Sequence, residues 1–95
     1  MENSGKYIGY LTSLESSTVI WSDDIEFIKK QWCFGMAIFE SNGIDREKLK
    51  ELFPEKPERG VVLDYLSENF NLVYQSGILV GRIITKREVL IEKFR

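Results

Sequence analysis

The sequence predicts an α+β domain, with a small, mostly antiparallel sheet of about five strands and three or four helices packed against it. Short stretches rich in β-branched and aromatic residues alternate with segments whose apolar residues recur at helical spacing. Glycine, asparagine and proline stand between these stretches, where turns are expected. The chain of 95 residues has the length of one domain. We therefore expect a single domain over residues 1–95, with a flexible tail over residues 1–5.

Composition narrows the class of protein. Hydrophobic residues make up 43% of the chain, which is enough for a core and argues against disorder. The net charge of -2 is not that of a free-standing nucleic-acid-binding domain, which is usually strongly basic. One cysteine and no histidine exclude an internal disulfide and a zinc site with the usual ligands. With no signal-peptide pattern and no apolar run near the roughly 20 residues that span a bilayer, we expect a soluble intracellular protein, cytoplasmic or nuclear.

The chain opens with a predicted β-hairpin. Residues 6–12 and 18–21 are rich in β-forming side chains, and residues 14–17 supply a polar connection. Gly9 lies inside the first strand, where a glycine indicates a bulge or a close approach of another group to the backbone.

A central helix and a third strand follow the hairpin. Ser22 or Asp23 caps the helix, and Asp23 with Glu26 forms a capping-box pattern. Gly35 fits the left-handed position that ends many helices, and residues 36–40 return to a strand. The apolar face of this helix is predicted to hold Ile25, Ile28 and Trp32.

A second helix is predicted after the turn at residues 41–43. Asp45 is its expected N-cap, and Ile44 and Leu49 are placed to form a hydrophobic staple across the cap. The helix must end before Pro54, because the residue that precedes a proline is disfavoured in helical geometry.

The last third of the chain predicts a helix, a hairpin and a final helix. Residues 61–70 carry apolar side chains at helical spacing. Residues 72–75 and 78–84 are expected to pair as a hairpin around a turn at Ser76-Gly77. A capping-box pattern that begins at Thr85 opens the final helix.

No constellation of residues points to catalysis. Cys33 has no histidine to activate it, so a packed structural thiol is favoured over a nucleophile. Asp23 and Asp24 stand at a helix start, where capping is favoured over metal binding or acid–base chemistry. Gly77 and Gly81 lack the spacing of a phosphate-binding loop. We predict no catalytic, cofactor-binding or metal-binding residue, and a protein that is not an enzyme.

The aromatic residues suggest where a partner binds. Trp21, Trp32, Phe27, Phe34 and Phe39 together offer a stacking platform for bases, but core packing is favoured for most of them. Trp32 and Phe34, near the predicted helix end, are the best candidates for an exposed contact.

The C-terminal segment adds two further candidates. Residues 82–95 hold five basic and two acidic residues, a local charge of +3. Such a segment can contact phosphate, although a solvated helix face is favoured. Arg87 and Phe94 in this segment join Trp32 and Phe34 as the predicted partner-contact residues.

A pattern of strand, acidic cap, helix and Phe-Gly runs through residues 18–35. The residues that carry it are Thr18, Val19, Ile20, Trp21, Asp23, Ile25, Ile28, Trp32, Phe34 and Gly35. The segments 63–66, 72–74 and 85–90 continue the pattern as a leucine-containing helix, a short strand and a capped helix. Over roughly residues 7–94 this order resembles the N-terminal domain of tRNA-splicing endonuclease subunits from archaea and eukaryotes.

The resemblance implies a non-catalytic structural domain or subunit of a tRNA-splicing endonuclease-like complex. Its partners would be the other endonuclease subunits, with RNA contacted only indirectly or weakly, no membrane and no cofactor. In that family RNA cleavage belongs to a separate C-terminal domain with a tyrosine, a histidine and a lysine, whereas this sequence has no histidine. The segment 40–60 is also longer than the family pattern leads us to expect.

The alternative function is a small stand-alone interaction protein, such as a viral or mobile-element inhibitor or adaptor that binds a host protein. Both functions depend on protein–protein contacts, and both leave open whether the chain forms an oligomer.

Overall fold

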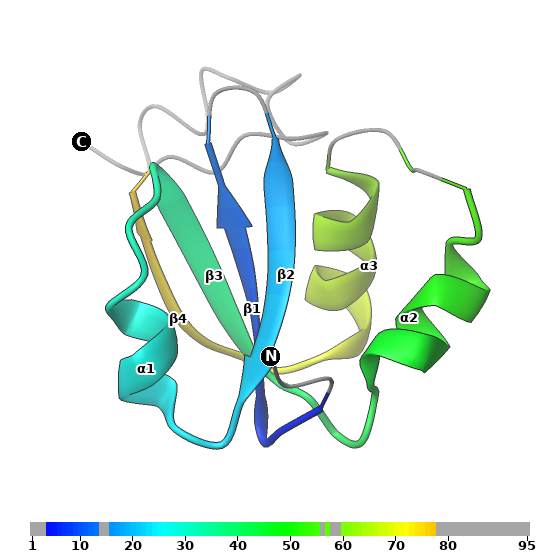
Figure 1. Cartoon of the computed structure of the whole chain (residues 1–95), viewed down its shortest axis with the longest axis horizontal. Helices are drawn as coiled ribbons and strands as arrows, with labels where there is room; N and C mark the ends of the chain where they lie inside the picture. Colours follow the sequence, from blue (N-terminus) through cyan, green and yellow to red (C-terminus); the bar gives the residue numbers. More distant parts are fainter. Residues whose placement is uncertain (1–3, 14–15, 56, 58–59, 78–95) are drawn as a thin grey trace.

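The structure is a computed structural model, and it describes residues 4–13, 16–55, 57 and 60–77. These residues form a four-stranded antiparallel sheet with the strand order β2-β1-β3-β4, and three helices pack on it (Figure 1). The α+β class is thereby confirmed, with four strands in the described residues rather than about five. The predicted strand at 78–84 and the helix from Thr85 lie outside the described residues. The elements are β1 (Tyr7–Thr12), β2 (Ser17–Ser22), α1 (Ile25–Lys29), β3 (Gly35–Glu40), α2 (Arg46–Leu52), α3 (Val61–Asn69) and β4 (Leu72–Gly77).

The helices divide between the two faces of the sheet (Figure 1). Because successive side chains of a strand point to opposite faces, β1 and β3 supply apolar groups to both sides. The face toward α2 and α3 buries Ile8, Tyr10, Trp21, Ala37, Phe39, Ile44, Leu63 and Leu66. The face toward α1 buries Leu11, Ile28, Met36 and Ile38. The central strands are therefore covered on both sides.

Gly9 allows α1 to pack closely on β1. A Cβ at this position would lie 2.6 Å from Cγ2 of Ile28, whose side chain is fully buried. The pairing of β1 with both neighbours is regular through Gly9. Of the two readings of this glycine, the close approach is confirmed. Among the described strands, the pairing shifts register instead between Ile38 and Phe39, where β3 pairs with β4.

The predicted start of the central helix, at Ser22 or Asp23, is one or two residues too early. Ser22 is still part of β2, and Asp24 is the N-cap, whose side chain accepts a hydrogen bond from the Glu26 N–H. Asp23 instead accepts a hydrogen bond of 2.8 Å from the backbone N–H of Lys6. The predicted Asp23–Glu26 capping box is thus wrong, because β2 extends to Ser22 and the Asp23 carboxylate binds the N–H of Lys6 instead of capping the helix.

The predicted end of the same helix is also wrong. α1 ends at Lys29 with Lys30 as its C-cap, and Gly35 is the first residue of β3. Gly35 pairs with Thr12 in β1 and with Gly77 in β4, so sheet pairing determines its conformation. As a result Trp32 lies in the loop after α1 and not on the apolar face of the helix.

The later elements agree better with the sequence. Asp45 caps α2 by accepting a hydrogen bond from the Lys48 N–H, and α2 ends before Pro54. Ile44 is buried in the same core cluster as Leu63 and Leu66 of α3, and the partly buried Leu49 packs against this cluster. α3 occupies the predicted segment. No helix among the described residues is long and apolar enough to cross a membrane.

The Ser76-Gly77 turn is not formed. Both residues belong to β4, where they pair with Met36 and Gly35. Gly77 has a φ of +70°, and a Cβ on it would overlap the carbonyl oxygen of Phe34. The strand therefore uses this glycine for close packing against the chain that leads into β3, rather than for a two-residue turn.

Candidate functional site

An exposed aromatic surface lies on α1 and on the loop between α1 and β3. We define the aromatic surface as Phe27, Trp32 and Phe34, whose exposed fractions are 50%, 90% and 43%. All three lie within eight residues of the chain. Single exposed apolar side chains are common on soluble proteins, but grouped large ones are a feature of contact sites.

The backbone on both sides of Trp32 is anchored. The Gln31 N–H donates to the carbonyl oxygen of Ile28, and the Gln31 side chain donates to that of Phe27, at 3.1 and 2.9 Å. On the other side, the Phe34 N–H donates to the carbonyl oxygen of Thr12 at 2.9 Å. The loop is thus tied to α1 and to β1, and it holds Trp32 in solvent.

The exposure of Trp32 leaves a large apolar area uncovered. A tryptophan contributes about 250 Å² when it is fully buried, of which 90% is exposed here. At about 25 cal/mol per Å², several kcal/mol of burial energy is not realised within the described part of the chain. The second tryptophan shows the contrast: Trp21 is 2% exposed, and its Nε1–H donates to the Ile44 carbonyl oxygen at 2.9 Å.

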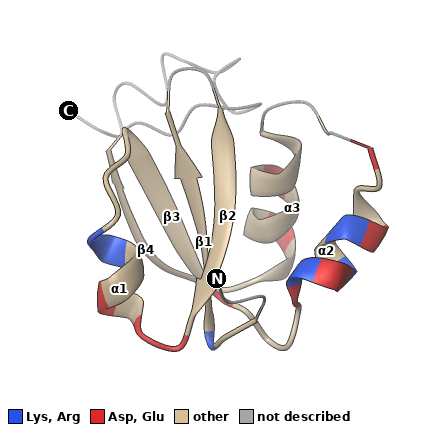
Figure 2. Cartoon of the chain, viewed as in Figure 1, with Lys and Arg blue, Asp and Glu red and all other residues tan. Residues whose placement is uncertain are grey.

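Acidic and basic residues both lie on α1 and in the segment that leads into it (Figure 2). Lys29 forms an ion pair of 3.4 Å with Glu26, and its ammonium group lies 4.4 Å from the ring centre of Tyr74 on β4. Exposed Asp24 and Lys30 stand at the two ends of α1. The segment from Asp24 to Phe34 therefore carries exposed aromatic side chains together with charges of both signs.

Cys33 lies between Trp32 and Phe34 in the loop but, unlike them, is half-buried. It packs against the cluster under α1. Burial raises the pKa of the Cys33 thiol, and backbone hydrogen bonds at Gly35 and Thr12 oppose this shift in part. The thiol is therefore protonated near neutral pH, as expected for a structural cysteine rather than an activated nucleophile.

The two neighbouring carboxylates also have structural contacts. Asp24 caps α1, and Asp23 binds the backbone of Lys6. They serve different segments, so the paired-carboxylate reading has no support in their geometry. Among the described residues, no three side chains of His, Cys, Asp or Glu are grouped as a metal site would need.

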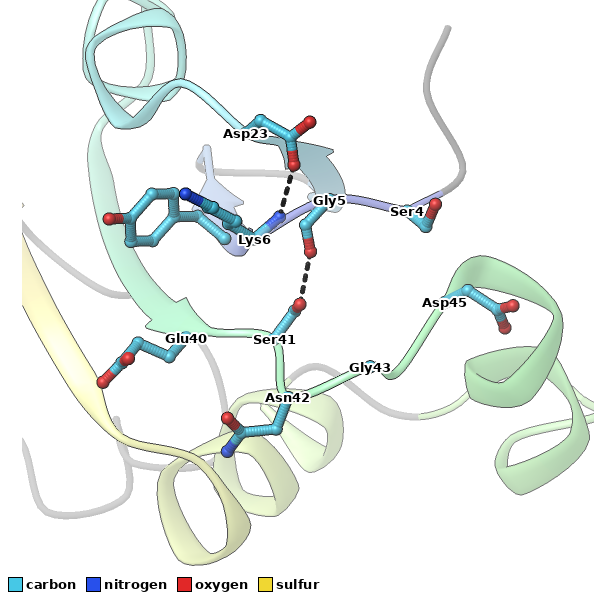
Figure 3. Close-up of a pocket in the computed structure, with 10 residues that line it drawn as sticks. Ser4, Gly5, Lys6, Asp23, Glu40, Ser41, Asn42, Gly43 and Asp45 are labelled. Atoms are coloured by element: carbon cyan, nitrogen blue, oxygen red, sulfur yellow. Dashed lines mark hydrogen bonds between the residues drawn. The ribbon is translucent and has the colours of Figure 1, made fainter.

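A polar cavity of about 830 Å³ opens beside the start of β1 (Figure 3). Its walls are the segment before β1, the β2–α1 loop and the β3–α2 loop. The Ser41 hydroxyl donates to the Gly5 carbonyl oxygen, and Asp23 accepts from Lys6. The other two carboxylates accept bonds outside the cavity centre, Glu40 from the Asn71 side chain and Asp45 from the Lys48 N–H. These bonds tie loops together.

This cavity was not predicted from the sequence, in which the segment 41–43 indicates only a turn. Its walls come from three segments that are distant in sequence. No local pattern signals such a cavity.

The two edges of the sheet differ. At the β2 edge, an Arg46 guanidinium nitrogen donates to the Val19 carbonyl oxygen at 3.3 Å, and the guanidinium lies 4.9 Å from the ring centre of Trp21. At the β4 edge, Leu72 and Val73 are exposed, and no described strand pairs beyond β4. The first edge is thus covered by a charged side chain, as is common for edge strands.

Of the four predicted contact residues, Trp32 and Phe34 are exposed as the prediction requires, and Arg87 and Phe94 lie outside the described residues. The structure adds Phe27, one of the five aromatic residues for most of which core packing was favoured, alongside Trp21 and Phe39. Those two are indeed buried. Ile25 and Ile28 share one face of α1, and Phe27 lies beside this face. This position beside the apolar face is the sequence feature that indicates the exposure of Phe27.

Comparisons with known protein families, with curated proteins and with solved structures found no match to this chain.

Proposed function

We propose that this chain is a non-catalytic protein-interaction domain that binds its partner through the aromatic surface of Phe27, Trp32 and Phe34. The single observation that carries the proposal is the 90% exposure of Trp32 in a loop anchored on both sides. Tryptophan is the residue most typical of interface hot spots, where it fills a pocket of the partner. Because the loop is already ordered, little conformational entropy is lost when Trp32 binds.

Charge favours a protein over a nucleic acid as the partner. The chain carries a net charge of -2, and the acidic side chains of Asp24 and Glu26 lie on α1 and at its cap. Lys29 is already engaged with Glu26 and Tyr74, which leaves the exposed Lys30 at the C-cap as a single cation of this helix outside an ion pair among the described residues. A nucleic-acid surface would need unpaired cations around its stacking residues, because phosphate contacts supply most of the affinity.

The resemblance to endonuclease subunits suggests one class of partner protein. Some residues that carry it, such as Trp21 and Ile28, have a role in packing the core. Trp32 and Phe34 carry it equally but are exposed, so core packing does not account for them. We propose that these two residues contact another subunit of a tRNA-splicing endonuclease-like assembly. For a stand-alone adaptor, the same surface would bind a single host protein.

Affinity purification of the tagged full chain from its native cell extract, followed by mass spectrometry, tests the proposal. The variants Trp32→Ser and Leu52→Ser are purified in parallel; Leu52 is a matched control, because it is an exposed apolar residue on α2. We expect a partner that is retained by the wild type and by Leu52→Ser and lost with Trp32→Ser. Thermal unfolding of all three proteins checks that the fold is intact.

Each outcome bears on a separate part of the proposal. Endonuclease subunits lost with Trp32→Ser support the subunit function, whereas one unrelated protein lost in the same way supports the adaptor. A partner that Trp32→Ser retains at the wild-type level would refute the aromatic surface as the binding site.

A further inference from the structure

We draw no further inference here: the strongest candidate, the outer edge of strand β4 with the exposed side chains of Leu72 and Val73, carries none because the described residues end at this strand and nothing in the structure shows what covers it.

Discussion

Replacing Gly77 with alanine tests how β4 is held against the chain that leads into β3. Two costs are expected. The φ of +70° is a left-handed conformation that disfavours a side chain by about 1–2 kcal/mol. In addition, the new Cβ would overlap the Phe34 carbonyl oxygen and lie 2.8 Å from the Cα of Gly35. Since both neighbours are backbone atoms, no rotamer change relieves the overlap.

Two other glycines separate these costs. Gly43 has a φ of +90° but no heavy atom within 4 Å of its ideal Cβ, so Gly43→Ala carries the conformational cost alone, about 1–2 kcal/mol. Gly9→Ala carries a steric cost alone. Its Cβ meets the side chain of Ile28, and overpacking of this kind costs about 1–3 kcal/mol.

For Gly77→Ala, the β3–β4 pairing must also loosen at its end, with the loss of one or two strand hydrogen bonds worth about 1 kcal/mol each. The total is about 3 kcal/mol or more, out of the roughly 5–15 kcal/mol typical of a domain. Urea unfolding, followed by far-ultraviolet circular dichroism, measures the free energy of unfolding of the three variants. A Gly77→Ala protein that loses no more stability than Gly43→Ala would refute the steric argument.

Four further predictions concern the cores and the aromatic surface. Trp21→Phe removes the hydrogen bond to Ile44 and should lower the free energy of unfolding by about 1–3 kcal/mol in urea titrations; an unchanged value would contradict a structural role for this bond. Asp45→Ala removes the α2 cap and should cost about 1 kcal/mol, whereas Asp45→Asn should restore most of it. Trp32→Ser should change the free energy of unfolding by less than about 0.5 kcal/mol, and acrylamide should quench Trp32 fluorescence far more than that of Trp21. The raised pKa of Cys33 predicts slower alkylation than a free thiol at the same pH, with the rate rising at higher pH. Since the folded pKa lies above the unfolded one, the free energy of unfolding is unchanged by this group below the unfolded pKa and falls as pH rises from the unfolded to the folded pKa.

The parts of the fold that local sequence determines were predictable. Asp45 and the proline at position 54 set the limits of α2 through interactions within the segment itself. The opening hairpin follows from its β-forming residues, and the structure pairs β1 with β2 as expected. In these segments backbone preference and tertiary packing favour the same conformation, so a rule based on neighbouring residues is sufficient.

The errors in the predicted elements occur where a residue that fits a local cap or turn pattern instead bonds to a segment distant in sequence. Asp23 fits an N-cap, but the N–H of Lys6 binds its carboxylate. Gly35 fits the end of a helix, and Ser76-Gly77 fits a turn. In the structure, however, Gly35 lies in β3 and Ser76-Gly77 lies in β4, and these two strands pair with each other. A glycine tolerates both a turn and a close strand pairing, so its identity alone does not choose between them. The choice depends on pairing between segments some forty residues apart.

The two tryptophans show why only part of the candidate site followed from the sequence. Both stand near apolar residues at plausible core positions, and only the place of Trp32 near the predicted helix end favoured its exposure. Trp21 is buried because β2 lies against β1 and its indole N–H finds an acceptor at Ile44, a partner 23 residues away. Trp32 is exposed because α1 ends at Lys29 and the hydrogen bonds of Gln31 and Phe34 fix the loop around it. The fold thus buries the Trp21 side chain and satisfies its indole N–H, whereas it holds the Trp32 side chain in solvent. A protein partner with an apolar pocket and a hydrogen-bond acceptor would give Trp32 the surroundings that the core gives Trp21.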